Sequence, residues 1–251
     1  MDSVLTLGIP LFYLSHLMVV TTRVGATLMF APVWGHPGIP NYFRILLIFV
    51  VSAGLASALP YNEAAYTNPG ALIPAEFAIG LLLSMGIRIV FAGLDLGGQM
   101  VSYHLGYSAV QTIDPQTMNR STLMASFYTL LGTVLLLATN QHYAIFQAMA
   151  SSYAVFPLGV LPATSTWFDT LISAAGQIFV LGWKIAFPVF LVSLLIEAAV
   201  GFVARMQPQI NTLIVTAPLK ILLGLLVLGA SLLVLPNVLG DAFEAANSLY
   251  R

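Results

Sequence analysis

Ionisable side chains that interrupt apolar stretches are the residues of this chain most able to do chemistry. Six of them lie within such stretches: Arg23, Glu76, Arg88, Lys184, Glu197 and Lys220. Each would cost about 2.5–3.5 kcal/mol at the centre of a lipid bilayer, so each needs a partner or water. Glu76 and Arg88 are 12 residues apart, and Lys184 and Glu197 are 13 apart, which puts each pair on different helix faces. We therefore expect their partners on other helices or other subunits.

The side chains that would support catalysis do not form a recognisable set. The four histidines, His16, His36, His104 and His142, lack metal-ligand spacing, and no His-Glu-x-x-His motif occurs. Asp95 lies between Gly93 and Gly97, as an intramembrane protease acid could, but no second carboxylate stands in a matching motif. The chain has no P-loop either. The sequence predicts no catalytic, cofactor or metal site, and so a protein that is not an enzyme.

The composition is that of a membrane protein. Of 251 residues, 59% are hydrophobic and 7% are charged, against about 25% charged in an ordinary soluble domain. The net charge is −1 and no basic run occurs, so nucleic acid is not expected as a partner. There is no cysteine to form a disulfide or a thiolate metal site. Apolar segments without a polar linker between them predict one domain.

Six apolar segments span residues 4–34, 42–59, 71–96, 121–139, 171–204 and 210–235. Backbone groups in lipid must be satisfied within the segment, so we expect helices and an all-α fold. A bilayer core needs about 20 helical residues, but residues 45–59 supply 15 and residues 171–204 supply 34. Pro188 within the long segment predicts two half-helices or a hairpin. Gly93, Gly97 and Gly98 would permit close helix packing.

The most polar passage of the chain joins the third and fourth apolar segments. Asp114-Pro115 is a turn signal, and Ser121 or Thr122 could cap the next helix. One interpretation is a solvent loop, and the other is a plug held inside a passage; composition does not separate them. The passage comprises Gly106, Tyr107, Ser108, Ala109, Val110, Gln111, Thr112, Ile113, Asp114, Pro115, Gln116, Thr117, Met118, Asn119, Arg120, Ser121 and Thr122.

Several short motifs, taken in order along nearly the whole chain, resemble the FliR family of flagellar export-gate proteins. They are Arg23, Ala31-Pro32, Pro40, Arg44, residues 106–115, residues 140–142, residues 156–159, and residues 205–211 continuing to residues 217–220. No single motif is specific, but their order and separation are. The resemblance implies a subunit that joins FliP and FliQ, with FlhB nearby, in a closed ring of kinked helices and helical hairpins. Unfolded flagellar proteins would pass through the centre of this hetero-oligomer.

The resemblance also assigns parts of the chain. It implies a FliP-like unit over about residues 1–170 and a FliQ-like unit over about residues 171–251. Residues 106–122 match the family's plug, with Ile113, Asp114, Pro115 and Met118 as its centre. The six charges within apolar segments would pair at helix or subunit interfaces. The location implied is the bacterial inner membrane at the flagellar basal body, largely at or above the periplasmic face, in contact with lipid.

Two alternatives remain open from the sequence. One is the homologous export-gate subunit of a virulence-type injectisome. The other is a secondary transporter of a small solute, for which six apolar segments, proline breaks and buried charges are also expected. An inverted repeat would favour the transporter, and none is evident in the sequence.

Overall fold

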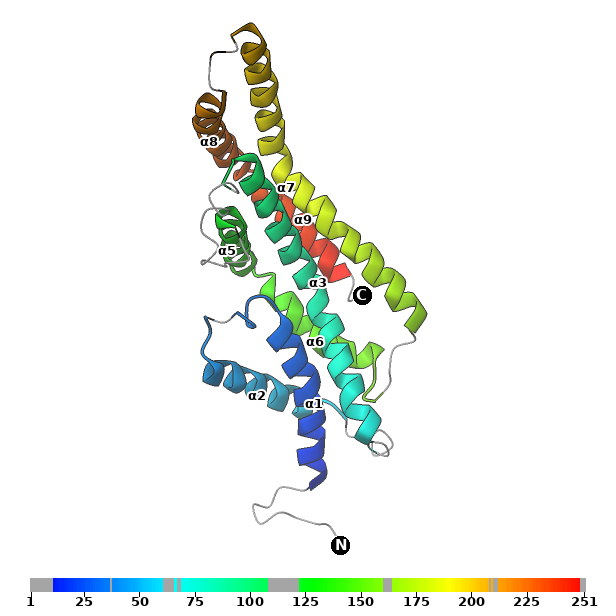
Figure 1. Ribbon diagram of the computed structural model, residues 1–251. Coiled ribbons are helices and arrows are strands. Elements are labelled where there is room, and N and C mark those ends of the chain that lie inside the picture. Colours follow the sequence, from blue (N-terminus) through cyan, green and yellow to red (C-terminus); the bar gives the residue numbers. More distant parts are fainter. Residues whose placement is uncertain are drawn as a thin grey trace. The chain divides into compact units, whose positions relative to one another are not determined.

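The computed structural model describes residues 11–36, 38–60, 66, 69–107, 122–159, 164–207, 209 and 212–248. Within these residues the regular structure is helical, which confirms the all-α prediction (Figure 1). The helices are α1 (Leu11–Phe30), α2 (Asn41–Ala58), α3 (Pro69–His104), α5 (Leu123–Ala138), α6 (His142–Val155), α7 (Thr164–Met206), α8 (Thr212–Ser231) and α9 (Leu235–Ser248).

The sequence predicts six membrane segments, but fewer than six of the described helices are long and apolar enough to cross a bilayer. Among the described residues, α2, the Gly70–His104 part of α3 and the Ala175–Met206 part of α7 meet this requirement by length and composition. The pairs α5 with α6 and α8 with α9 meet it only when each pair is taken as one broken span. The described residues therefore offer three crossings, or up to five, in place of six independent ones.

The prediction of two half-helices or a hairpin over residues 171–204 is wrong. Helix α7 runs without interruption from Thr164 to Met206 with Pro188 inside it. Proline lacks the N–H that would bond the carbonyl of Lys184, four residues earlier, but this removes one bond from a helix of 43 residues. Membrane helices tolerate such a loss where neighbouring groups or local adjustment satisfy the freed carbonyl.

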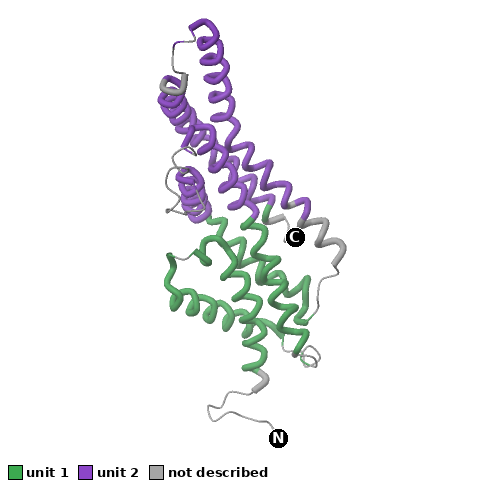
Figure 2. Tube along the Cα trace, viewed as in Figure 1, with its two compact units in different colours: residues 1–88, 140–171, 246–251 green, residues 89–139, 172–245 purple. Residues whose placement is uncertain are grey.

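The chain divides into two compact units, each of which draws on distant parts of the sequence (Figure 2). Unit 1 comprises residues 1–88, 140–171 and 246–251, and unit 2 comprises residues 89–139 and 172–245. These units are defined by spatial contacts. The expected FliP-like and FliQ-like parts are defined by relationship between sequences, so that division stays a prediction.

Glycines set the close helix contacts inside each unit. In unit 1, a Cβ on Gly80 of α3 would lie 2.5 Å from the carbonyl oxygen of Arg23 in α1. In unit 2, a Cβ on Gly93 would lie 2.8 Å from Leu181 of α7, and one on Gly97 would lie 3.0 Å from Ile185. The predicted role of Gly93 and Gly97 in close packing is therefore confirmed, and it operates between α3 and α7 of the same chain.

Candidate functional site: the two ends of the 106–122 segment

The polar segment begins at a well-defined end of α3. The Gly106 N–H donates to the Tyr103 carbonyl at 3.1 Å, and the Tyr107 N–H donates to the Ser102 carbonyl at 3.0 Å. This pair of bonds is a Schellman motif, which requires a left-handed residue after the helix. Gly106 supplies it with φ = 82°, a conformation that costs glycine little. The helix therefore stops at a fixed point, where the predicted plug starts.

The same end of α3 is attached to α7 and α8 within unit 2. The Nδ1 of His104 lies 3.3 Å from the Ser193 hydroxyl of α7, in a hydrogen bond. The His104 ring also packs edge-on against Phe190, with 4.9 Å between ring centroids. Leu105 is 1% exposed and fills the space over Gly224 of α8, where an added Cβ would lie 2.1 Å from its Cδ2. Helices α7 and α8 thus hold the end of α3 from which the segment starts.

The other end of the segment is a helix N-cap. The Thr122 hydroxyl oxygen accepts a hydrogen bond from the Ala125 N–H at 3.2 Å, so the predicted cap is confirmed at Thr122. Directly after the cap, α5 lies against α3: a Cβ on Gly98 would be 2.4 Å from the Ala125 Cα. The next contact pairs Gly132 with Leu94. Between these two contacts the residue number rises from 125 to 132 in α5 and falls from 98 to 94 in α3, so the two helices are antiparallel.

The connection between α3 and α5 is much longer than this packing requires. Gly98 lies beside Ala125, and from Gly98 helix α3 continues by six residues, or about 9 Å, to His104. A few residues could return the chain over that distance, and helix connections in bundles usually have about 2–8. Residues 106–121 number 16 and could reach about 50 Å if extended. A connection of this length exceeds the upper end of that range about twofold.

Most of the predicted plug lies outside the described residues. The structure does not describe residues 108–121, which include the proposed centre at Ile113, Asp114, Pro115 and Met118. Gly106, Tyr107 and Thr122 are described, and all three serve the helix ends. The plug role of the segment therefore stays a prediction, with its two attachment points known.

Arg23 and Glu76, two of the six charges, form a buried ion pair in unit 1. The Arg23 Nε donates to one Glu76 carboxylate oxygen at 2.6 Å and Nη2 to the other at 3.0 Å, with both side chains fully buried. Arg23 also donates to the Ser152 hydroxyl at 3.1 Å and to the Phe156 carbonyl at 3.0 Å. Its guanidinium lies 4.0 Å from the ring centroid of Tyr153. The pair thus joins α1, α3 and α6.

Two of the motifs that carry the family resemblance, Arg23 and residues 156–159, meet at this ion pair although they are far apart in the sequence. The Gly159 N–H donates to the Glu76 carboxylate at 3.0 Å, and the Phe156 carbonyl accepts from Arg23, so residues 156–159 contribute backbone groups. The sequence alone did not predict the part that Ser152, Tyr153 and these backbone groups take in the site. No local pattern marks them, because a residue's type does not record which distant helix it touches.

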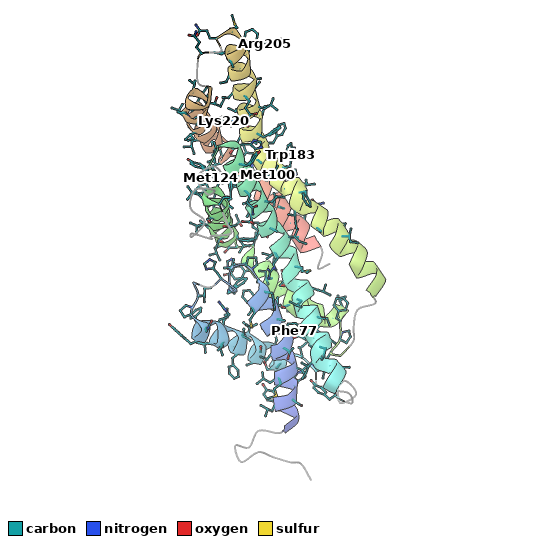
Figure 3. All side chains as sticks on the ribbon, in the orientation of Figure 1. Phe77, Met100, Met124, Trp183, Arg205 and Lys220 are labelled. Atoms are coloured by element: carbon teal, nitrogen blue, oxygen red, sulfur yellow. The ribbon has the colours of Figure 1, made fainter. Side chains whose placement is uncertain are left out.

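The other charges divide between paired and unpaired groups. Glu197 of α7 and Lys220 of α8 form an ion pair in unit 2 (Lys220 is labelled in Figure 3). Arg88 donates to the Phe30 carbonyl at 3.1 Å. Lys184 is exposed and has no charged partner among the described residues. The expectation that partners come from other helices is confirmed for the two ion pairs and for Arg88, while pairing with other subunits stays a prediction.

These features define a class of protein: a helical membrane protein whose ionic groups are mostly paired across helices, with one long polar connection attached at both ends. Within the described residues, no three His, Asp or Glu side chains gather as a metal site would require.

Comparison with known proteins identifies the family. The family model for bacterial export proteins, family 1, matches residues 14–246. The flagellar biosynthetic protein FliR of Caulobacter vibrioides is 28% identical over 229 residues, which cover 90% of this chain and 91% of that protein. FliR of Aquifex aeolicus is 26% identical, covering 92% and 91%, and FliR of Escherichia coli is 25% identical, covering 83% and 80%.

The chain therefore belongs to the FliR family of flagellar export proteins. The resemblance predicted from its motifs is confirmed, and the flagellar interpretation is favoured over the injectisome. Membership in this family makes it a component of the flagellar export apparatus, and its apolar helices indicate an inner-membrane location.

Proposed function

We propose that this chain is a structural and gating subunit of the flagellar type III export channel, joined to FliP and FliQ in a closed helical ring. The observation that carries the proposal is the connection between α3 and α5. It is far longer than antiparallel packing requires. Its two ends are fixed by helix caps at Gly106 and Thr122. The helices at these ends also pack closely at Gly224 and Gly98. A segment of this length suits a reversible plug, because attachment at both ends would keep it at the channel whether the gate is closed or open.

The apolar surface of the chain supports assembly with other helices. In the most apolar 18 residues of the α7 span, 28% are buried within the chain, and in α2 the share is 17%. The Ala175–Met206 part of α7 has 32 residues, about 48 Å of helix against a bilayer core of about 30 Å. Exposed apolar patches of this extent mark contact with lipid or protein. Helices of neighbouring subunits would cover the length that the bilayer does not.

The remaining parts of the proposal concern the surroundings of the subunit. FlhB and the exported flagellar proteins are its expected further contacts, and the assembly would stand largely at or above the periplasmic face. The relatives are named as flagellar biosynthetic proteins, and we infer a role without catalysis, powered by other components.

Co-expression with FliP and FliQ tests the assembly. The three chains would be extracted in detergent, isolated through a tag on this chain, and weighed by native mass spectrometry. We expect one complex that contains all three. A stable monomer that moves a small solute across proteoliposomes unaided would overturn the proposal in favour of a secondary transporter.

A further inference from the structure

Unit 2 contains a cavity of about 280 Å³ between α5, α7, α8 and α9. Most of its lining is aliphatic, with Ile185, Pro188, Val227 and Leu235 among the walls. A cavity of this size is close to the lower limit of small-ligand pockets, which run from about 300 to 1,000 Å³. Its walls offer few partners for water, which needs two to four polar contacts. An apolar group is therefore the better filling for most of this space.

Three polar side chains line the same cavity: Tyr128, Lys184 and Ser231. Tyr128 is 1% exposed, and its hydroxyl lies near Ser231 but has no hydrogen bond of ordinary length with any described group. The Ser231 hydroxyl donates to the Leu228 carbonyl at 2.7 Å. A buried hydroxyl without a partner costs about 1–3 kcal/mol. The wall of the cavity thus contains a buried hydrogen-bond donor, the Tyr128 hydroxyl, which a ligand oxygen would satisfy if the side chains around it moved aside.

Lys184 is the cationic side chain that lines the cavity. It is exposed and meets no carboxylate among the described residues, whereas Tyr128 is buried. The carbonyl of Lys184 also receives no bond from Pro188, which has no N–H. A ligand that fits would have an anionic group near Lys184, an acceptor oxygen within reach of Tyr128, and an aliphatic part against the walls.

We propose that this cavity binds an anionic phospholipid, with the headgroup phosphate on the Lys184 ammonium and part of an acyl chain in the apolar space. A phospholipid combines all three elements, because its ester carbonyl lies between its phosphate and its chain. The carboxylate of a partner subunit would satisfy Lys184, but a short acidic side chain would leave much of about 280 Å³ unfilled. Helix α7 and the pair α8 with α9 are candidate spans by length and composition, so we expect lipid to reach them when the chain is in a membrane. The proposal does not depend on the export gate.

Lipid retention by the full chain, purified without partners in neutral detergent, tests the proposal. Phosphatidylglycerol or phosphatidylcholine would be added, and the bound molecules counted by native mass spectrometry. We expect about tenfold preferential retention of phosphatidylglycerol, equivalent to about 1.4 kcal/mol. Lys184→Gln should bring the preference close to parity, and Tyr128→Phe should weaken retention by a smaller factor. Ala230→Phe, which fills the cavity, should reduce retention of both lipids.

Lys220→Gln is the matched control, because Lys220 is a cation of the neighbouring helix that is paired with Glu197 and does not line the cavity. It should retain lipid as the wild type does. Equal retention of the two lipids by the wild type would overturn the proposal, as would an unchanged preference in Lys184→Gln. Competition by inorganic phosphate alone at millimolar concentration would indicate a free anion in place of lipid. Carbodiimide cross-linking of Lys184 to a partner chain, with no lipid retained, would indicate a partner's carboxylate.

Discussion

The Arg23 Nε donates to the Glu76 carboxylate at 2.6 Å, across a sequence separation of 53 residues and between two helices of unit 1. Both side chains are fully buried. The desolvation cost of such a pair is offset only when the remaining donors and acceptors are also bonded. Here the Ser152 hydroxyl, the Phe156 carbonyl and the Gly159 N–H complete the set. The pair therefore fixes how α1, α3 and α6 meet.

Removing the arginine should destabilise the chain strongly. Arg23→Met leaves the Glu76 carboxylate buried with the Gly159 N–H as its hydrogen-bond donor, and breaking a buried pair in this way costs about 3–5 kcal/mol. We expect low accumulation in membranes and a lower melting temperature of the detergent-solubilised chain. The double variant Arg23→Met with Glu76→Met should recover much of this loss, because no uncompensated charge remains.

Arg88→Met is the matched control for this prediction. Arg88 is exposed and bonds one carbonyl, that of Phe30, so the change should shift stability by at most about 0.5–1 kcal/mol. An Arg23→Met chain that accumulates and melts as the wild type does would show that the ion pair contributes nothing to unit 1.

The contact between α3 and α5 leaves no room for a side chain at Gly98. A Cβ there would lie 2.4 Å from the Ala125 Cα and 2.6 Å from its nitrogen, which are backbone atoms and cannot rotate away. Gly98→Ala should therefore separate the two helices at a cost of about 1–3 kcal/mol. Thermal unfolding of the purified chain measures this cost.

Gly201→Ala provides the comparison, since a Cβ at Gly201 meets nothing within 4 Å. Alanine is the better helix former by up to about 1 kcal/mol, so this variant should be as stable as the wild type or more stable. Equal melting temperatures for Gly98→Ala and the wild type would contradict the close approach of α3 and α5.

Local sequence signals predicted those features whose cause is local. Long apolar runs mark α2, α3, α5 and α8, because a helix in lipid must satisfy its own backbone. Thr122 could be identified as a cap because capping involves the next three residues only. Gly93 and Gly97 could be identified as packing positions because only a missing side chain permits such approach.

Features that depend on tertiary context could not be predicted in the same way. The sequence showed that Arg23 and Glu76 each needed a partner, but not that they were partners of each other. Pro188 favoured a break in α7, and the continuous helix shows that surrounding packing overrides one lost bond. Helices α6 and α9 were missed because they lack a long uniform apolar run.

The predicted plug can be removed without touching the groups that hold its ends. Replacing residues 108–121 by a six-residue Gly/Ser linker keeps the Gly106 cap and the Thr122 cap and still bridges the short gap between α3 and α5. We expect the complex with FliP and FliQ to assemble normally but to conduct ions in planar bilayers, because nothing then fills the passage. Thr122→Ser, which preserves the cap, should remain closed. Unchanged conductance after the replacement would count against a plug.

The ion pair between Glu197 and Lys220 allows the contribution of partner subunits to be separated from folding. The Glu197 side chain is 57% exposed although it is paired, and that of Lys220 is 17% exposed. Glu197 thus presents carboxylate surface that a cation of a neighbouring subunit could contact. Exposed pairs by themselves contribute about 0–1 kcal/mol, so Glu197→Lys should affect the isolated chain little. It should reduce recovery of the complex with FliP and FliQ.

The double reversal, Glu197→Lys with Lys220→Glu, decides between the two sources of any effect. It restores an attractive pair within unit 2, so the melting temperature of the isolated chain should stay close to that of the wild type. It also places positive charge where a partner would expect negative charge, so recovery of the complex should stay low; like charges brought together across an interface cost several kcal/mol. Normal recovery of the complex by the double variant would mean that Glu197 acts only within its own chain.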